Sequence, residues 1–228
     1  MQVTYNLRLF RATPQVNTML QNATIPLLSV VVPVFNEQES INDVLAEFRQ
    51  VLDESTVGDW EAVIVNDGSK DSTAECLEAW RARDSRFRVI HLRRNAGQTA
   101  AFDAGFKAAR GEFIGMMDGD GQNDPRDFPK LLEELKSTGV DMMCGYRARR
   151  RDTIVRIISS RVANGTRNWL TGESIRDVGC SIRVFRRVCL DRIKLYRNMH
   201  RFFPTLVRME GFRIGEIPVN HRPRQRGK

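Results

Sequence analysis

The stretch LLSVVVPVF, residues Leu27–Phe35, decides the fold class of this chain. It is an apolar run rich in the β-branched residue valine, and Ser29 is its only polar side chain. Strands that are covered on both faces lose the apolar and polar alternation that half-exposed strands show. The stretch therefore predicts a strand inside a sheet that has helices on both sides.

Similar apolar runs recur along the chain. Three of them, Trp60–Asn66, Phe87–Leu92 and Glu112–Asp118, predict further strands, and IGEIPV, residues Ile214–Val219, predicts a last one. The segments between the first four strands have apolar residues at the spacing of one helical face. This alternation predicts an α/β fold with a mostly parallel central sheet and right-handed crossovers.

Three helices are expected between these strands. The first has its apolar stripe within residues 41–52 and begins after Asn36 or Ser40 as its cap. The second begins after Asp71 or Ser72, and the third covers about Thr99–Ala109.

Polar loops follow four of the predicted strands. They are Asn36–Glu37, Asn66–Ser69, Arg93–Gly97 and Asp118–Pro125. In open parallel sheets, ligands bind outside the carboxyl ends of the strands. Any one of these loops has the composition of an ordinary turn, because Asn, Asp and Gly dominate turns. Four of them at one edge of the sheet indicate a binding face.

The acidic loop suggests a metal site. Asp118 and Asp120 are separated only by Gly119, directly after an apolar strand. Hard oxygen ligands in this arrangement suit Mg²⁺ or Mn²⁺, which often take their remaining ligands from water and substrate phosphates. A DxD triplet alone is weak evidence, and its place among the other polar loops is what favours a metal.

Composition limits the class of protein. The chain has 228 residues and a formal net charge of +8, which fits one domain with anionic partners such as a phosphorylated substrate, nucleic acid or an acidic membrane face. The four cysteines form no CxxC pair, so a reducing, cytosolic setting is expected and no zinc site is indicated. No apolar run approaches the roughly 20 residues of a membrane-spanning helix.

The segment Thr153–Leu170 predicts an amphipathic helix with an apolar stripe and several arginines. Such a helix either packs on the core or lies in a lipid interface. Considered alone, the pattern favours the core.

Six motifs together resemble a known family. VVVPVFNEQESI, VNDGSKDST, RNAGQTAAFDAG, MDGDGQNDP, GYR and DVGCSIRVFRR occur in this order. The chain from about Leu28 onward resembles the family 2 glycosyltransferases of the GT-A fold, and within them the polyprenyl-phosphate glycosyltransferases, the group of dolichol-phosphate mannose synthase. The resemblance implies transfer of a sugar from a UDP- or GDP-sugar to a polyprenyl phosphate, with a Mg²⁺ or Mn²⁺ cofactor and inversion at the sugar.

The resemblance also implies roles for matching residues. The residues expected to bind the nucleotide and the loop beside it are Pro33, Phe35, Asn36, Glu37, Asp67, Asn95 and Gly97. The metal and diphosphate motif matches Asp118, Asp120 and Gln122. The residues expected near the reaction centre and the acceptor phosphate are Arg147, Asp177, Ser181, Arg183, Arg201 and Arg224.

The resemblance further implies membrane association. It places Thr153–Leu170 where such enzymes rest on the membrane, which reverses the preference for the core. The family pattern RxxGxSKY matches at Arg224 and Gly227, but the chain stops at Lys228, so transmembrane helices are expected beyond it in a longer protein. The expected organisation is a leader at residues 1–24 and one catalytic domain at residues 25–228 on the cytoplasmic side of the membrane. A homo-oligomer is left open for the full-length protein.

Two alternatives use the same residues differently. A family 2 transferase acting on a saccharide hydroxyl would need a base, for which Asp177 is the candidate. The charge and the run RARRRD, residues Arg147–Asp152, would also suit nucleic acid. Because the sequence has no aromatic RNP pattern and no recognition-helix motif, a nucleic-acid partner is not expected. The donor base and the sugar are left open.

Overall fold

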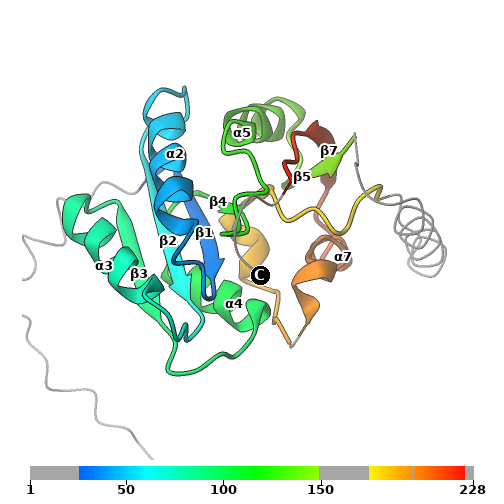
Figure 1. Ribbon diagram of the computed structural model, residues 1–228. Helices are drawn as coiled ribbons and strands as arrows, with labels where there is room; N and C mark the ends of the chain where they lie inside the picture. Colours follow the sequence, from blue (N-terminus) through cyan, green and yellow to red (C-terminus); the bar gives the residue numbers. More distant parts are fainter. Residues whose placement is uncertain (1–25, 149–174, 197, 224–228) are drawn as a thin grey trace, which may run out of the picture.

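The computed structural model describes residues 26–148, 175–196 and 198–223. Its centre is a seven-stranded sheet with the strand order β3-β2-β1-β4-β6-β5-β7 (Figure 1). The leader at residues 1–24, the helix expected over Thr153–Leu170 and Arg224 lie outside the described residues.

Six strands run in one direction, so the predicted α/β fold with a mostly parallel sheet is confirmed. All seven residues of the central strand β1 are buried, as the unbroken apolar run predicts. The parallel strands are β1 (Leu28–Val34), β2 (Trp60–Asn66), β3 (Phe87–His91), β4 (Phe113–Met116), β5 (Met142–Arg147) and β7 (Ile214–Val219).

The remaining strand, β6 (Arg183–Arg186), is antiparallel to its neighbours β4 and β5. An antiparallel strand begins at the edge of the sheet where the parallel strands end. Residues just before and at the start of β6 therefore join the loops that follow β1, β2 and β4.

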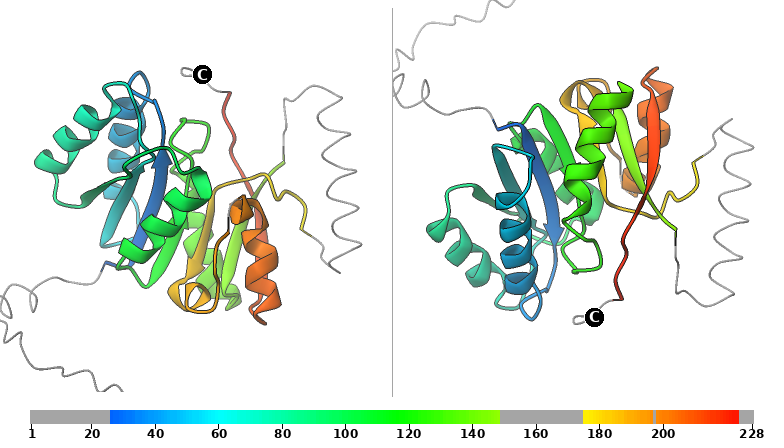
Figure 2. Two further views of the ribbon diagram at one scale, coloured as in Figure 1. Left: turned by 90° about the horizontal axis from the view of Figure 1, so that it is seen from below. Right: turned by 90° about the horizontal axis from the view of Figure 1, so that it is seen from above.

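Helices cover both faces of the sheet (Figure 2). Figure 2 shows α4 (Gln98–Ala108) and α7 (Phe203–Met209) in front of the sheet in one view, and α2 (Ile41–Asp53) and α5 (Asp127–Thr138) in front of it in the opposite view. Helix α3 (Thr73–Arg83) packs on the same face as α2 and α5. Two short 3₁₀ helices, η1 (Arg187–Leu190) and η2 (Met199–Phe202), precede α7.

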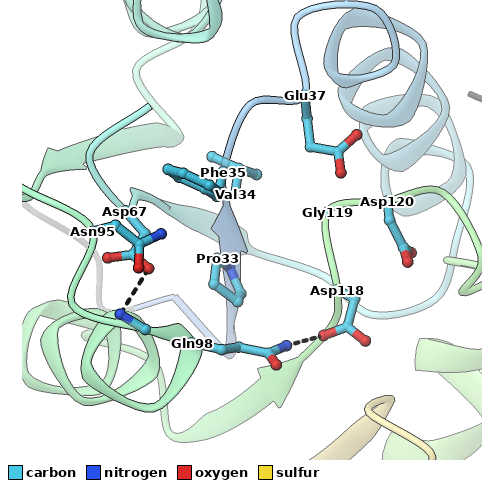
Figure 3. A pocket seen from close by; sticks show the side chains of 11 residues that line it. Pro33, Val34, Phe35, Glu37, Asp67, Asn95, Gln98, Asp118, Gly119 and Asp120 are labelled. Carbon is cyan, nitrogen blue, oxygen red and sulfur yellow. Dashed lines mark hydrogen bonds between the residues drawn. The ribbon is translucent and has the colours of Figure 1, made fainter. Parts of the chain in front are cut away.

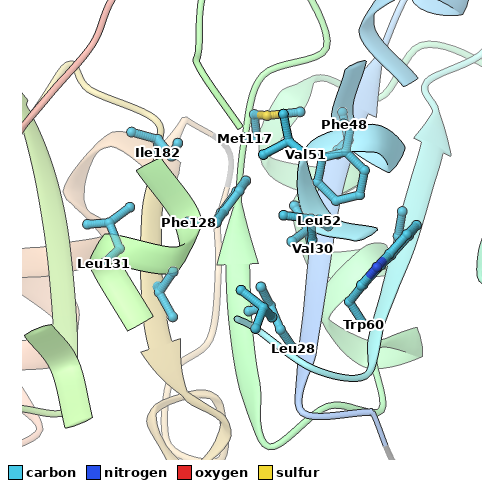
Figure 4. Packing of buried hydrophobic residues seen from close by; sticks show 14 of the residues in the cluster. Leu28, Val30, Phe48, Val51, Leu52, Trp60, Met117, Phe128, Leu131 and Ile182 are labelled. Atoms are coloured by element: carbon cyan, nitrogen blue, oxygen red, sulfur yellow. The ribbon is translucent and has the colours of Figure 1, made fainter. Parts of the chain in front are cut away.

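The core on the α2 and α5 face is built around aromatic rings (Figure 4). The Phe48 ring of α2 meets Trp60, Phe87 and Phe128 edge to face, at centroid distances of 5.4, 6.4 and 6.2 Å. Burial of one such side chain contributes about 1.5–3 kcal/mol. This packing fixes α2 and α5 relative to the strands and so fixes the loops that precede both helices.

The structure confirms Ser40 and Ser72 as N-cap residues, but neither side chain makes the hydrogen bond to a helix amide that a cap usually makes. Ser40 is the N-cap of α2, yet its hydroxyl donates to the Glu37 carboxylate at 2.6 Å instead of accepting from a helix amide. Ser72 is the N-cap of α3, and it is the Asp71 carboxylate that accepts from the Thr73 amide and hydroxyl. Asn36 as a cap of α2 was a wrong prediction, because its side chain bonds to the loop after β2.

Candidate functional site

A pocket of about 360 Å³ opens at the carboxyl ends of β1, β2 and β4 (Figure 3). This is the edge that the polar loops predict. The pocket, which we call the donor pocket after the ligand expected from the sequence, brings together residues from the end of β1, four loops and the first turn of α4. They are Pro33, Val34, Phe35, Glu37, Asp67, Asn95, Gly97, Gln98, Asp118, Gly119 and Asp120.

The loop after β1 supplies an aromatic ring and a carboxylate. Phe35 is 42% exposed, and Glu37 is buried. Asn36 does not line the pocket. Its backbone has a φ of 55°, and its side-chain oxygen accepts from the Lys70 amide at 2.8 Å. Asn36 therefore joins the loops after β1 and β2, and its predicted contact with a nucleotide has no support from this geometry.

Asp67 shapes the pocket wall. Its buried carboxylate accepts hydrogen bonds from the amides of Ala96 at 2.7 Å and Gly97 at 3.0 Å. Gly68 allows the close approach of this loop, because a Cβ there would lie 2.4 Å from the Arg94 carbonyl carbon. Asp67 thus holds the loop after β3 against the loop after β2.

Asp118 and Asp120 lie at the opposite wall. Gly119 places them there, since a Cβ at this position would lie 2.5 Å from Val34 Cγ1. Burial raises the pKa of Asp118, and the nearby charge of Asp120 raises it further. Among the residues described, neither carboxylate forms an ion pair with Lys, Arg or His. Two adjacent carboxylates that form no ion pair offer the hard oxygen ligands that a divalent cation prefers.

Gln122 does not join this pair. Its side-chain amide donates to the Arg222 carbonyl at 3.4 Å, and Gln122 does not line the donor pocket. Within the described ranges, no third Asp, Glu, His or Cys completes a cluster with the two carboxylates. The geometry supports Asp118 and Asp120 as metal ligands and gives no support to Gln122.

Gln98 and Asn123 were missed as site residues. The Gln98 side chain donates to Asp118 at 2.6 Å. The Asn123 side-chain oxygen accepts from the Asp118 amide at 3.0 Å and from the Ser181 hydroxyl at 2.9 Å. Both residues stand in quoted motifs, one at the start of a helix and one after the DxD triplet. For Gln98, the sequence signal was a polar side chain at the start of a helix next to the predicted binding edge.

A second pocket of about 320 Å³ adjoins the first. Gln98 and Asp118 line both, so the two pockets meet at Asp118. This acceptor pocket contains four of the residues predicted near the reaction centre and the acceptor phosphate, together with residues of η2 and the segment before β6. Its polar lining is Gln98, Asp118, Arg147, Ser181, Arg183, His200 and Arg201.

Arg183 is the most buried cation of the acceptor pocket. It is only 2% exposed, and its two terminal nitrogens donate to the carbonyls of His200 at 3.2 Å and Val178 at 2.8 Å. Within the ranges that the structure describes, its Nε has no hydrogen-bond partner. A buried guanidinium held by carbonyl dipoles, with no carboxylate within ion-pair distance in the described part of the chain, retains its full charge for an anion.

Arg147 is engaged differently. Its guanidinium forms a two-point ion pair with Asp177, with Nε–Oδ2 and Nη2–Oδ1 distances of 2.7 and 3.0 Å. Its backbone amide also donates to Asp177 at 3.2 Å. Asp177 is therefore the partner of an arginine, and it would have to give up that pairing to act as a base.

His200 adds a neutral polar group. Its Nδ1 lies 2.8 Å from the Thr99 hydroxyl at the start of α4. Burial lowers the pKa of His200 to about 4, and the charges of Arg201 and Arg183 act in the same direction. The ring is uncharged at neutral pH, so the positive charge of the acceptor pocket comes from arginines alone.

Comparisons with known proteins identify the family of this chain. The model of the family described as Glycosyl transferase family 2 matches residues 29–194. A dodecaprenyl-phosphate galacturonate synthase of Rhizobium johnstonii is 39% identical over 204 residues, which are 88% of this chain and 60% of that protein. An undecaprenyl-phosphate 4-deoxy-4-formamido-L-arabinose transferase of Salmonella choleraesuis is 36% identical over 92% of this chain and 64% of its own length. The chain thus spans about 60% of the length of these relatives.

Solved structures share the fold. Glucosyl-3-phosphoglycerate synthase from Mycobacterium tuberculosis, in complex with Mn²⁺ and UDP-glucose, superposes with a TM-score of 0.67 at 17% identity, over 96% of this chain and 78% of that one. A mannosyltransferase from Pyrobaculum calidifontis, in complex with GDP-Man and Mn²⁺, superposes with a TM-score of 0.62 at 18% identity, over 86% of this chain and 56% of that one.

Proposed function

Because the chain belongs to glycosyl transferase family 2, we propose that it transfers a sugar from a nucleotide sugar to a polyprenyl phosphate, with inversion at the anomeric carbon. The observation that carries this proposal is the pair of pockets that meet at Asp118. One contains the Asp118 and Asp120 carboxylates, which form no ion pair among the described residues, and the other contains the buried Arg183, whose Nε has no hydrogen-bond partner there. The named substrates of the relatives, which are polyprenyl phosphates, support the acceptor class.

The donor pocket suits a nucleoside diphosphate sugar. Its volume of about 360 Å³ lies within the range of small-molecule sites. The exposed ring of Phe35 offers a stacking surface for a base at the outer end. Glu37 and Asn95 provide polar contacts beside it, and Asp67 supports the wall. Both uracil and guanine remain candidates for the base.

Asp118 and Asp120 would hold the metal, Mg²⁺ or Mn²⁺. Two carboxylates are enough for such an ion, because diphosphate oxygens and water supply the remaining ligands. When bound, the ion neutralises the charge that develops on the departing diphosphate. The Gln98 amide orients the Asp118 carboxylate in the absence of the ion.

The acceptor pocket suits a phosphate monoester. Arg183 and Arg201 offer positive charge, and the Ser181 hydroxyl lies beside them. A guanidinium binds phosphate by two parallel hydrogen bonds and keeps its proton at any physiological pH. The lipid phosphate would attack the anomeric carbon from this side while the nucleotide occupies the donor pocket, which gives inversion.

The geometry favours a phosphate over a hydroxyl as the nucleophile. A phosphate is already ionised at neutral pH and needs no general base, whereas a hydroxyl does. The one candidate base, Asp177, already accepts two hydrogen bonds from the Arg147 guanidinium. Catalysis would then consist of alignment and electrostatic stabilisation by the arginines.

The acceptor is a membrane lipid, so we place the reaction at the cytoplasmic face of a membrane. The net charge of +8 favours contact with anionic lipids. Among the described helices, none is both long enough and apolar enough to cross a bilayer.

Titration calorimetry tests the proposal. UDP and GDP are each titrated into the protein with Mn²⁺ and with EDTA, and one nucleotide is expected to bind in the micromolar range only with the metal. Asp120→Ala should remove this binding without unfolding the chain, because Asp120 belongs to neither apolar core cluster and its carboxylate accepts a hydrogen bond from the Gln122 amide of its own loop. Transfer of radiolabelled sugar to undecaprenyl phosphate then tests the acceptor.

The outcomes separate the parts of the proposal. No binding of either nucleotide in Mn²⁺ would overturn the donor assignment. Unchanged metal-dependent binding in Asp120→Ala would overturn the metal site. Transfer to a free saccharide but not to the lipid phosphate would favour the hydroxyl alternative, with Asp177 as the base.

A further inference from the structure

The segment that follows β7 lies along the loop that carries Asp118 and Asp120. Residues Asn123 and His221 form an antiparallel bridge between the two segments. The Arg222 amide donates to the Gln122 carbonyl at 2.9 Å, and the Gln122 side chain donates back to the Arg222 carbonyl at 3.4 Å. We propose that Arg222 is a positioning residue that holds the Asp118–Asp124 loop in the shape required to bind the metal and the diphosphate.

Arg222 is suited to this role because its guanidinium spans two carboxylates on different elements. It donates to both oxygens of Glu47 on α2, at 2.7 and 2.9 Å, and its Nη2 lies 2.8 Å from Asp124 Oδ2. The Arg222 side chain is only 23% exposed, and that of Asp124 is 7% exposed. The hydrogen bond from Arg222 holds the pKa of Glu47 below its usual value, so the pair is ionised over the physiological range.

Neighbouring contacts anchor the same end of the loop. The Asn220 side chain donates to Asp124 at 2.9 Å, and the Asn220 amide donates to Asp127 in the first turn of α5 at 2.9 Å. Residues 122–124 are thus held between α2, α5 and the segment after β7. The loop is therefore anchored at its far end, at residues 122–124, as well as where it leaves β4.

Two hydrogen bonds connect this anchored end of the loop to Asp118 and Asp120. The Gln122 amide donates to the Asp120 carboxylate at 3.1 Å, so the orientation of Asp120 depends on the position of Gln122. The Asn123 side chain accepts from the Asp118 amide. Asp118 and Asp120 repel one another until a cation binds, and an unanchored loop would separate them. Arg222 therefore offsets that repulsion from outside the site, since it lines neither the donor pocket nor the acceptor pocket.

The role rests on the proposed metal-dependent nucleotide binding, and its test measures binding and loop protection separately. The apparent Kd for Mn²⁺ is measured by titration at a fixed, saturating concentration of the nucleotide that the wild-type chain binds. Loss of a residue that orients metal ligands typically weakens metal affinity by about 10- to 100-fold. Arg222→Ala is therefore expected to raise the Kd for Mn²⁺ at least ~10-fold. Amide hydrogen exchange of residues 118–124 should accelerate in the same variant.

Arg86→Ala is the matched control. Arg86 also bridges two carboxylates, Asp53 and Asp84, but at the opposite edge of the sheet. Arg86→Ala should lower the melting temperature about as much as Arg222→Ala does. It should leave both the Mn²⁺ affinity and the exchange of residues 118–124 unchanged. Arg222→Lys keeps the charge but cannot span Glu47 and Asp124 with one planar group, so it is expected to recover stability more fully than Mn²⁺ affinity.

Glu47→Gln keeps Arg222 and weakens its anchor on α2, together with the ion pair between Glu47 and the exposed Arg126, so it tests the role if Arg222→Ala does not fold. It should weaken Mn²⁺ binding in the same direction and by less. Equal Mn²⁺ affinity and equal exchange in wild type, Arg222→Ala and Glu47→Gln would overturn the role proposed for Arg222 and leave the proposed function intact. Failure of the wild-type chain to bind any nucleotide would overturn the proposed function, and the exchange of residues 118–124 would still decide whether Arg222 holds the loop.

Discussion

At the scale of single residues, burial separates two arginines that the sequence presents alike. Arg147 forms an ion pair with Asp177, whereas Arg183 is buried among backbone carbonyls and its Nε has no hydrogen-bond partner in the part of the chain that the structure describes. Burying a guanidinium without an anion beside it costs free energy, so the burial of Arg183 supports a role in binding an anion. Arg183 is therefore the residue from which we expect the larger effect on the acceptor.

Arg183→Lys tests this expectation. Lysine keeps the positive charge but loses the planar fork, so it cannot hold both the Val178 carbonyl and a phosphate in the same geometry. The KM for polyprenyl phosphate should rise about 10-fold, which corresponds to ~1.4 kcal/mol, while nucleotide binding stays unchanged. Steady-state transfer and nucleotide titration on the same preparation measure both quantities. An equal loss of nucleotide affinity would mean that Arg183 serves the donor side.

The second prediction at this scale concerns pH. The pKa of His200 lies at about 4 in the folded chain, below the ordinary value of 6.5, so the unfolded chain binds the proton more tightly. The stability that His200 contributes is complete above pH 6.5 and is lost as the pH falls from 6.5 toward 4. Because the ring is partly exposed, the loss should be on the order of 1–2 kcal/mol.

His200→Gln isolates this contribution. Glutamine can replace the hydrogen bond to Thr99 but does not titrate. The difference in free energy of unfolding between wild type and variant should decrease as the pH falls from 7 to 4.5, as followed by urea denaturation at each pH. A difference that stays constant with pH would contradict the assignment, since the carboxylates common to both proteins cancel.

At the scale of elements, the loops after β2 and β3 depend on each other. Gly68 has a φ of 67°, and a Cβ there would lie 2.4 Å from the Arg94 carbonyl carbon. Gly58 has a φ of 81° and has nothing within 4 Å of the equivalent point. At both glycines the positive φ is unfavourable for other residues. Only at Gly68 would an added Cβ also collide with a neighbouring atom.

Alanine at each position separates the two effects. Gly58→Ala should cost about 1 kcal/mol of unfolding free energy from the backbone alone. Gly68→Ala should cost ~2–3 kcal/mol and should also weaken nucleotide binding, because it pushes residues 94–97 away from the Asp67 carboxylate. Thermal denaturation and nucleotide titration measure these effects. Equal destabilisation by the two variants would show that the contact at Gly68 relaxes at no cost.

At the scale of the whole molecule, the sequence predicted the parallel strands β1, β2, β3, β4 and β7, but neither the parallel strand β5 nor the antiparallel strand β6. The β1 and β2 runs are unbroken because both faces are covered, and that pattern can be read locally. The short strand β6 has arginines at both ends and owes its place to pairing with β4 and β5, a long-range property. Periodicity therefore could not indicate it.

The site shows the same division. Asp118 and Asp120 were predicted from their position after a strand, and the pocket contains both. Gln98 and Asn123 act through partners that are distant in sequence, such as Ser181, and only the folded chain brings them together. The roles predicted for Asn36 and Gln122 came from motif matches, and their side chains instead join loops to one another.

The net charge of +8 leads to the last prediction, which concerns the chain as a whole. Each basic residue near an anionic surface contributes about 1 kcal/mol, and this attraction falls off within a Debye length. The protein should therefore sediment with vesicles containing anionic phosphatidylglycerol at 50 mM salt and be released by about 0.5 M salt. Vesicles of neutral phosphatidylcholine are the control and should not bind it.

Duplex DNA distinguishes a membrane role from non-specific attraction to any polyanion. If the charge serves a lipid surface, adding polyprenyl phosphate to neutral vesicles should recruit the protein through the acceptor pocket, and Arg183→Lys should weaken that recruitment while leaving DNA binding unchanged. DNA binding that is tighter than binding to anionic vesicles at equal charge and salt would instead favour the nucleic-acid alternative. The comparison thus assigns the basic surface by its partner, because charge alone attracts both.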